Sequence, residues 1–195
     1  MQPDAPAGFP GDWLAEPGEP ASDVELALLL VNSHDLLEDP PDRLVDLDWL
    51  THVFTRVGHG DLAGRLTRRD LPRLRRLRDA RRQVFETDDD ATSAAVLNPL
   101  LEKASAVPLI DVDQAGDAVL RVGLGLRGIA ALEARLPAAV AAYVVEHGTG
   151  RLGVCGSDPC RCVFVDRTRA GTRKYCCTSC NDRFAARAYR RRKKF

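Results

Sequence analysis

All six cysteines of this chain lie between residues 155 and 180, and the residues before them contain none. They form two short-spaced groups, Cys155-x4-Cys160-x-Cys162 and, after thirteen further residues, Cys176-Cys177-x2-Cys180. Two such groups, separated by a hairpin-sized insert, can wrap opposite sides of one tetrahedral zinc ion. The pattern therefore predicts that residues 151–195 fold as a small module around a metal.

Four of these six thiols are enough to bind one Zn²⁺ ion. We predict that the ligands are Cys155, Cys160, Cys176 and Cys180. Two alternatives stay open: Cys162 can replace Cys160, and Cys177 with Cys180 can form the second pair. A four-thiolate site has no open coordination position, which is typical of structural rather than catalytic zinc. Because so small a module has little core, we expect the metal to supply much of its folding free energy.

The residues around the cysteines predict a treble-clef-like arrangement of a hairpin and a helix. Val163–Val165 has strand character, residues 169–172 supply a turn, and a helix is expected to start near Thr178. Cys176 then lies just before the helix and Cys180 in its first turn, so both can point at one metal. The free N–H groups of a helix start also stabilise thiolate charge.

The charges of the chain are segregated, although the formal net charge is zero. Residues 1–150 carry 15 basic and 25 acidic side chains, whereas residues 151–195 carry 13 basic and 3 acidic ones. Such an excess of positive charge in a short module favours a polyanionic partner. The alternative is that two solvated surfaces of opposite charge attract each other within the molecule.

The basic residues after the last cysteine share one face of the predicted helix. At i+3 and i+4 spacing this face comprises Arg183, Arg187, Arg190, Arg191 and Lys194. The other side carries Phe184, Ala185 and Ala188, which we expect to pack against Val154 and Phe164. We predict that the basic face contacts nucleic acid. Alternatively, these terminal cations favour the negative end of the helix dipole and aid solubility.

The first 150 residues predict a mainly α-helical domain, residues 22–150, behind a flexible leader rich in proline and glycine, residues 1–21. Helices are expected over residues 23–37, 45–54, 70–86, 92–104 and 126–147, and a β-hairpin over residues 107–112 and 118–122. Ser22 and Glu25 form a capping box, and Asp70 is the expected N-cap of the third helix. The arginines of this third helix are expected to be solvated on a core-facing helix.

Nothing in the sequence suggests secretion, a membrane partner or catalysis. The first 20 residues lack the basic and then apolar order of a secretory signal, and no apolar run approaches the length of a membrane span. We therefore expect a cytoplasmic protein, in which clustered cysteines are metal ligands rather than disulfides. The four histidines lack metal-ligand spacing, and no phosphate loop or nucleophile elbow is apparent, so no enzymatic activity is expected.

The C-terminal module resembles a CGNR-type zinc finger. The similarity rests on the C-x4-C spacing, on Phe164-Val-Asp166-Arg-Thr168-Arg169, which fits F-x-D-x-[ST]-R, and on the aromatic-Cys step Tyr175-Cys176. The Cys-Gly-Asn-Arg step of the family is Cys180-Asn181-Asp182-Arg183 here. Two of its four positions differ, and Asp182 places a negative charge beside the basic face. The resemblance implies a DNA-binding module of bacterial regulators.

The preceding domain resembles the ABATE domain, which commonly precedes this finger and is described as a stress-induced transcription regulator. The similarity rests on LALLLVNSHDLL, on LPRLRRLRDARRQVF and on Val96-Leu-Asn-Pro-Leu-Leu before a hairpin. Together the two resemblances cover about residues 22–194. Asn32 lies in a family-like Val-Asn-Ser/Thr step, and we expect it to be a buried, hydrogen-bonded structural residue rather than a ligand contact.

The sequence thus predicts a regulator of transcription in the stress response. Its helical domain would sense an unidentified effector or form a homodimer, and its zinc finger would contact DNA. The main alternative is a thiol-based redox or metal sensor, because Cys162 and Cys177 lie beside predicted ligands and oxidation could eject Zn²⁺. A third hypothesis is a finger that binds a protein partner, such as a polymerase, and not DNA.

Overall fold

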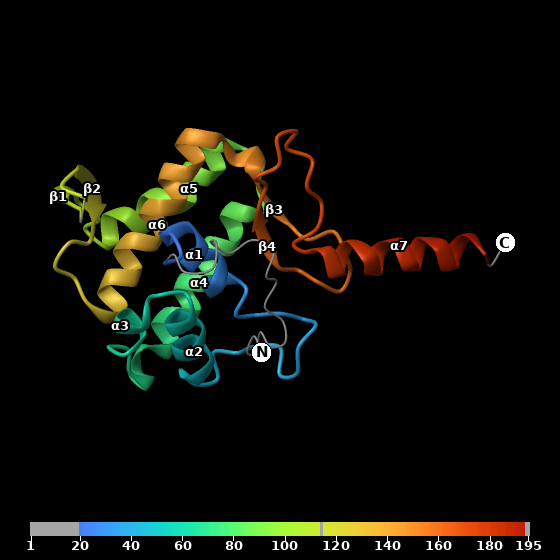
Figure 1. The fold of residues 1–195 in the computed structure, drawn as a ribbon, viewed down its shortest axis with the longest axis horizontal. Helices are drawn as coiled ribbons and strands as arrows, with labels where there is room; N and C mark the ends of the chain where they lie inside the picture. The colour runs from blue at the N-terminus through green and yellow to red at the C-terminus, as the bar shows by residue number, and fades with distance from the viewer. Residues whose placement is uncertain (1–19, 114, 194–195) are drawn as a thin grey trace.

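The computed structural model of this protein describes residues 20–113 and 115–193 of the 195-residue chain. Most of the predicted leader, and Lys194 at the end of the predicted basic face, lie outside these residues. A body of packed helices makes up most of the molecule, and the last helix, α7, extends away from it as a single rod (Figure 1).

The elements confirm the predicted fold class, which is mainly α with a helical domain, a small hairpin and a C-terminal hairpin-plus-helix module. The helical domain contains α1 (Asp23–Val31), α2 (Asp48–Arg56), α3 (Gly60–Ala63), η1 (Arg68–Asp70), α4 (Leu71–Phe85), α5 (Asp90–Lys103), β1 (Pro108–Val112), β2 (Ala118–Val122) and α6 (Gly128–His147). The C-terminal module contains η2 (Thr149–Arg151), β3 (Leu152–Val154), β4 (Val163–Val165) and α7 (Thr178–Arg192).

Helix α1 begins where the sequence predicts, but it ends earlier. The Ser22 amide donates to the Glu25 carboxylate at 2.7 Å and the Ser22 hydroxyl accepts the Glu25 amide at 3.4 Å, which confirms the capping box. The helix ends at Val31 and not near residue 37. The Asn32 side chain turns to β4, and the Ser33 hydroxyl donates to the Leu30 carbonyl at 2.7 Å. Such side-chain bonds compete with the next helical turn.

Aspartates that bond locally shape the starts of two other helices, and of these two the start of α2 differs from the prediction. Helix α2 begins at Asp48 and not at residue 45, since the Asp46 carboxylate accepts the Asp48 amide at 2.9 Å in a turn. Asp70 precedes α4 as predicted, but its carboxylate accepts the amide and hydroxyl of Thr67 and makes no side-chain cap on α4. Asp70 thus stabilises the short helix η1 before α4.

Two arginines of α4 lie in the core, so the expectation that its arginines are solvated is wrong for them. The Arg81 side chain is fully buried, and its guanidinium donates to the carbonyls of Leu77 and Leu132 at 3.3 and 3.4 Å. Arg78 is also buried and pairs with Asp42 at 2.7 Å. Both lie within three or four residues of buried leucines along the helix and therefore share the inward face.

The core of the helical body is centred on α1, α4 and α6. All residues of α1 from Glu25 to Val31 are buried, and α1 packs against α4 and α6. Within the described residues α6 is the one helix long and apolar enough to span a membrane by length and composition, which sequence reasoning did not anticipate. It packs against α1 and α5, and 44% of its apolar window is buried. Because the central helix of a globular core meets the same criterion, its composition is weak support for a membrane span.

The antiparallel hairpin of β3 and β4 belongs to two cores at once. Side chains on successive strand residues point to opposite faces. Leu152, Val163 and Val165 therefore pack into the core of the helical body, whereas Phe164 packs among the cysteines on the other face. Gly153 lies opposite Phe164, where a Cβ atom would approach the ring to 2.7 Å. The hydrophobic core of the helical body thus continues into the C-terminal module.

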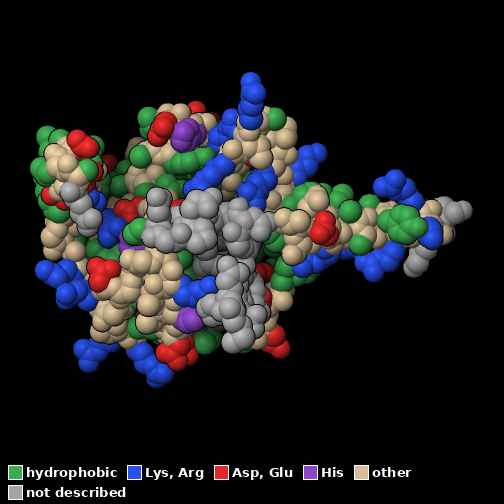
Figure 2. Space-filling model, viewed as in Figure 1, with side chains coloured by type: hydrophobic (Ala, Val, Ile, Leu, Met, Phe, Trp, Pro, Cys, Tyr) green, Lys and Arg blue, Asp and Glu red, His purple; other side chains and the backbone are tan. Residues whose placement is uncertain are grey.

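The other hairpin leaves an apolar face in solvent. The register places Pro108 opposite Val122, Ile110 opposite Leu120 and Val112 opposite Ala118, so these six residues share one face. Ile110 and Leu120 are 76% and 72% exposed. Figure 2 shows hydrophobic side chains gathered at the end of the molecule where β1 and β2 lie. This face has no charged residue.

Candidate metal centre and basic helix

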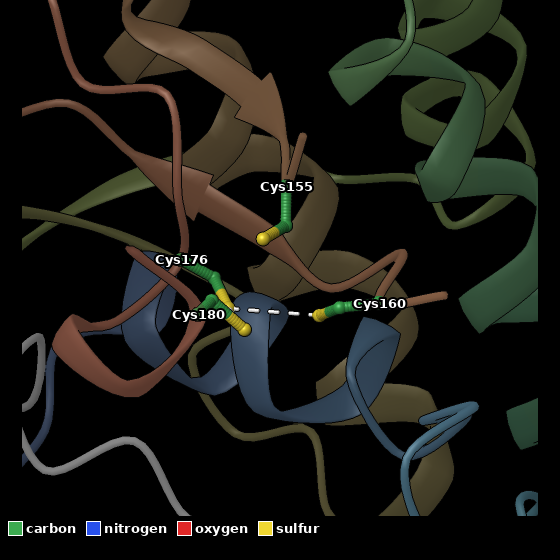
Figure 3. A group of neighbouring side chains, drawn as sticks. All are labelled: Cys155, Cys160, Cys176 and Cys180. Carbon is green, nitrogen blue, oxygen red and sulfur yellow. Dashed lines mark hydrogen bonds between the residues drawn. The ribbon is translucent and has the colours of Figure 1, made fainter. Parts of the chain in front are cut away.

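Four cysteine thiols converge where the β3–β4 hairpin, the following loop and the start of α7 meet (Figure 3). Cys155 follows β3, Cys160 lies between β3 and β4, Cys176 lies just before α7, and Cys180 lies in its first turn. All four are buried, and their Sγ atoms lie within 4.8 Å of one another. The structure thus brings together the four ligands that the sequence predicts.

The geometry of this cluster fits one tetrahedral zinc ion. The Cys176 Sγ atom lies 3.6 Å from that of Cys180 and 3.7 Å from that of Cys160. Four sulfur atoms at about 2.3 Å from a central zinc ion would be about 3.8 Å apart in a tetrahedron. All six cysteines, which lie within the described residues, are free thiols. Bound zinc would hold the hairpin and α7 together through four thiolates and offer no site for a substrate.

The clustered thiols shift the pKa values of one another. Hydrogen bonds from the Cys155, Cys162 and Cys176 thiols lower the pKa of Cys160. Hydrogen bonds with Cys155 and Cys160 raise the pKa of Cys176, and burial followed by the charge on Cys160 raises the pKa of Cys180. The protein alone thus favours a first thiolate and opposes the next ones. Since a divalent cation offsets this repulsion, metal binding should release protons from the cluster.

The two remaining cysteines lie beside the cluster. The Cys177 Sγ atom is 3.8 Å from that of Cys176, and its side chain is half-buried. The buried Cys162 thiol lies within 4.8 Å of both the Cys160 thiol and an Asp35 carboxylate oxygen. This geometry favours the four predicted ligands over a set in which Cys162 or Cys177 replaces one, and the assignment itself stays a prediction.

Two residues outside the thiol set shape the loop that carries Cys176. The buried Asp166 carboxylate accepts the Thr168 amide and hydroxyl at 2.8 and 2.6 Å and the Arg173 amide at 2.7 Å. Burial alone would raise the pKa of Asp166, but these hydrogen bonds hold it below its ordinary value. The Arg173 guanidinium donates to the carbonyls of Tyr175 and Cys176. Sequence reasoning used Asp166 as a motif match and missed Arg173, which has no periodic signal.

Asn32 joins the helical body directly to β4. Its side-chain amide donates to the Val163 carbonyl at 3.0 Å and its side-chain oxygen accepts the Val163 amide at 2.7 Å. The Asn32 side chain is buried and thus bonds β4 as a neighbouring strand would. The prediction that Asn32 is a buried, hydrogen-bonded structural residue is confirmed.

Polar contacts on either side of Asn32 complete this junction. Arg167 donates to the buried Glu25 carboxylate at 3.1 Å, so Glu25 serves both the α1 capping box and the C-terminal module. Arg82 at the end of α4 donates to the Arg161 carbonyl at 2.8 Å, and the Arg161 side chain pairs with Glu86 at 3.2 Å. These contacts hold the turn between Cys160 and Cys162 against α4.

The structure divides the predicted basic face of α7 into two parts. Arg183 is half-buried and donates to the Cys180 Sγ atom at 3.5 Å. Arg187 donates to the backbone carbonyl and the carboxylate of Asp158 at 2.6 and 3.0 Å. Arg190 and Arg191 are exposed farther along the rod, and Figure 2 shows basic side chains on opposite sides of it. The first two arginines thus anchor the helix, and the next two point into solvent.

The expected packing of the other side of α7 is wrong. Phe184 is 42% exposed and contacts the Tyr175 ring, with the ring centroids 5.2 Å apart. Val154 instead packs against the core of the helical body, and Phe164 lies among the cysteines. Because the thiol cluster fixes α7 by its first turn, the rest of the helix extends away from both residues (Figure 1).

These features define a class of protein, in which a helical domain is joined to a four-cysteine zinc-finger module. Residues 151–193 match the family described as CGNR zinc finger. Residues 25–150 match the ABATE family, described as putative stress-induced transcription regulator. Since this second match covers more than half of the sequence, the chain belongs to the ABATE family and carries a CGNR finger after that domain. No curated protein matches the chain.

Proposed function

We propose that this protein is a cytoplasmic, non-enzymatic regulator of transcription in the stress response that binds DNA through α7. The observation that carries the proposal is the placement of this helix. Cys180 is its one buried residue, and the helix carries five arginines and one aspartate. A cationic helix that projects from the body is suited to the phosphate-lined major groove of B-form DNA, which admits an α-helix. The deep, narrow major groove of A-form RNA does not admit an α-helix.

The zinc module has a positioning role in this proposal. Zinc would fix the first turn of α7 through Cys176 and Cys180, and Arg187 adds a second anchor on Asp158. Arg190 and Arg191 then extend beyond the anchored part. Contacts from these side chains to phosphates would orient the protein on DNA without reading its sequence directly.

Binding to duplex DNA should depend steeply on salt. Beyond the two anchoring arginines the sequence has five cations, Arg190, Arg191, Arg192, Lys193 and Lys194. If all five contact phosphates, the plot of log K against log salt concentration is expected to have a slope of about −4 to −5, because each neutralised phosphate contributes about −0.9. In a fluorescence-anisotropy titration, an Arg190→Ala/Arg191→Ala variant should reduce the magnitude of this slope by about 2. The matched control, Arg68→Ala/Arg69→Ala, changes two exposed arginines of η1 and should leave the slope unchanged. A wild-type slope near zero contradicts the proposal.

A second candidate function, a thiol sensor, is favoured by the position of Cys177 beside Cys176. Peroxide would oxidise one thiolate to a sulfenic acid with release of hydroxide, and a second thiolate would displace hydroxide to form a disulfide. A disulfide between Cys176 and Cys177 would remove one of the four predicted thiolate ligands, and this loss would favour release of Zn²⁺. In an assay with a colorimetric chelator, Cys162→Ser/Cys177→Ser should slow peroxide-dependent zinc release if these surplus thiols take part. Release at the wild-type rate would exclude their role.

The exposed face of the β1–β2 hairpin supports the proposal of a homodimer. A two-stranded hairpin with little packing is only marginally stable in water. An apolar face without charges can pack against the same face of a second copy across a two-fold axis. Sedimentation is expected to give twice the 21.4 kDa chain mass. Ile110→Lys/Leu120→Lys should give the monomer, and Val145→Lys, at an exposed position of α6, should not. A wild-type protein that stays monomeric at high micromolar concentration contradicts this dimer.

A further inference from the structure

A pocket of about 520 Å³ lies between α4, α5 and α6 in the helical body, away from the thiol cluster. Leu77, Leu100 and Ala104 contribute apolar surface to it, and Arg73, Arg76 and Lys103 contribute positive charge. Pockets of roughly 300–1,000 Å³ with apolar walls and a few polar groups are typical of sites for small molecules. The pocket is lined by residues of α4, α5 and α6 and by Ala104, which directly follows α5.

The charges around this pocket do not cancel. Among the described residues of its lining, Glu133 is the one acidic residue, and both of its carboxylate oxygens already accept hydrogen bonds from Arg73. Within the described residues, Arg76 and Lys103 have no hydrogen-bond or ion-pair partner. The fully buried Arg81 lies one turn farther along α4, and its Nε atom also lacks a partner. This excess of positive charge favours a negatively charged ligand.

We propose that this pocket binds a small organic carboxylate with an apolar body. Arg76 and Lys103 would bind the carboxylate, and Leu77, Leu100 and Ala104 would contact the apolar body. An inorganic anion would leave the apolar wall in water, and a neutral apolar ligand would gain nothing from the two cations, which would stay hydrated. A carboxylate of this kind satisfies both halves of the lining.

Helix α4 connects this pocket to the zinc module. Arg73 and Arg76 lie near its start, and Arg82 near its end donates to the Arg161 carbonyl between Cys160 and Cys162. A ligand that binds α4 and α5 together therefore acts on the same helix that holds the Cys160–Cys162 turn. The inference that the pocket controls DNA binding rests on the proposed function. The inference that the pocket binds a carboxylate does not.

The test is isothermal titration calorimetry of the full zinc-loaded chain, without DNA, with 2-naphthoate, octanoate and the neutral isostere 2-naphthamide. We expect 2-naphthoate to bind at least about tenfold more tightly than 2-naphthamide, since hydrogen bonds to charged groups contribute about 1.5–3 kcal/mol. Arg76→Ala should weaken 2-naphthoate by a similar factor and leave 2-naphthamide unchanged. Arg76→Lys should recover part of the affinity, and Arg69→Ala, outside the pocket, should match the wild type.

Three results would overturn the inference: no binding of either carboxylate at millimolar concentration, equal affinities for 2-naphthoate and 2-naphthamide, or wild-type affinity in Arg76→Ala. Because Arg76 is exposed, its variants are expected to fold, which circular dichroism checks. The titration contains no DNA, so its failure leaves the DNA-binding proposal standing. A flat salt dependence of DNA binding would equally leave the carboxylate site intact.

Discussion

Replacing Cys176 with serine is expected to abolish zinc binding and to unfold α7 and the loop before it, while the helical body and the β3–β4 hairpin stay folded. Serine lacks the thiolate that completes the four-sulfur set. Zinc contributes about 10–16 kcal/mol to the folding of small zinc-finger modules at neutral pH. Loss of one ligand of four should therefore leave less than one zinc ion per chain in a metal analysis of the purified protein.

The unfolding should be partial because the two halves of the C-terminal module are held differently. Leu152, Val163 and Val165 are buried in the core of the helical body, and this contact does not involve the metal. Helix α7, in contrast, buries Cys180 alone. Hydrogen exchange followed by mass spectrometry should therefore show lost protection over residues 166–192 and retained protection in α1, α4 and β4.

The neighbouring cysteine provides the matched control. Cys177→Ser makes the same replacement of sulfur by oxygen at the next residue, whose thiol is half-buried and lies outside the cluster of four. It should retain one zinc ion and wild-type exchange. If Cys177→Ser loses zinc and Cys176→Ser retains it, Cys177 is the ligand and the assignment is wrong. If Cys176→Ser exposes the whole chain to exchange, the folding of the helical body depends on the metal, and the prediction of partial unfolding is wrong.

The features that the sequence predicts correctly depend on neighbouring residues. The Ser22–Glu25 capping box, the β1–β2 hairpin and the start of α7 at Thr178 are determined by side-chain chemistry within a few positions. The thiol cluster is predictable for a related reason, because short spacings within each cysteine group limit how the thiols can be arranged. Local chemistry thus yields the order of elements and the composition of the candidate metal site.

The features that the sequence does not predict depend on contacts between distant segments. Hydropathy places every arginine in solvent, and it cannot indicate that the carbonyls of Leu77 and Leu132 would accept Arg81 in the core. The amphipathic pattern of α7 suggests a packed side, but the helix is fixed by its first turn and extends from the body. The hairpin likewise packs on the helical body, and no signal within residues 151–195 indicates that contact.

Asn32 is the residue at which this long-range docking can be tested with the largest expected effect on stability. It satisfies both backbone groups of Val163, which lies 131 residues away, inside the protein. Asn32→Ala would leave one buried N–H and one buried carbonyl of β4 without a partner. Since each of these two unsatisfied buried groups costs about 1–3 kcal/mol, the free energy of unfolding should fall by about 2–6 kcal/mol. Urea denaturation followed by circular dichroism measures this change.

Two further variants separate the hydrogen bonds from simple loss of volume. Asn32→Asp keeps the shape of the side chain and the oxygen that accepts the Val163 amide. Its second carboxylate oxygen cannot donate to the Val163 carbonyl oxygen and would instead lie against it. The Asn32→Asp variant should therefore also be less stable than the wild type. If Asn32 contributed only its volume, the stability of this variant would be near that of the wild type. Asn98→Ala, at an exposed position of α5, should change stability by less than about 0.5 kcal/mol. The thiols are untouched, so all three variants should still bind one zinc ion. Wild-type stability in Asn32→Ala would mean that the hairpin docks without this pair of hydrogen bonds.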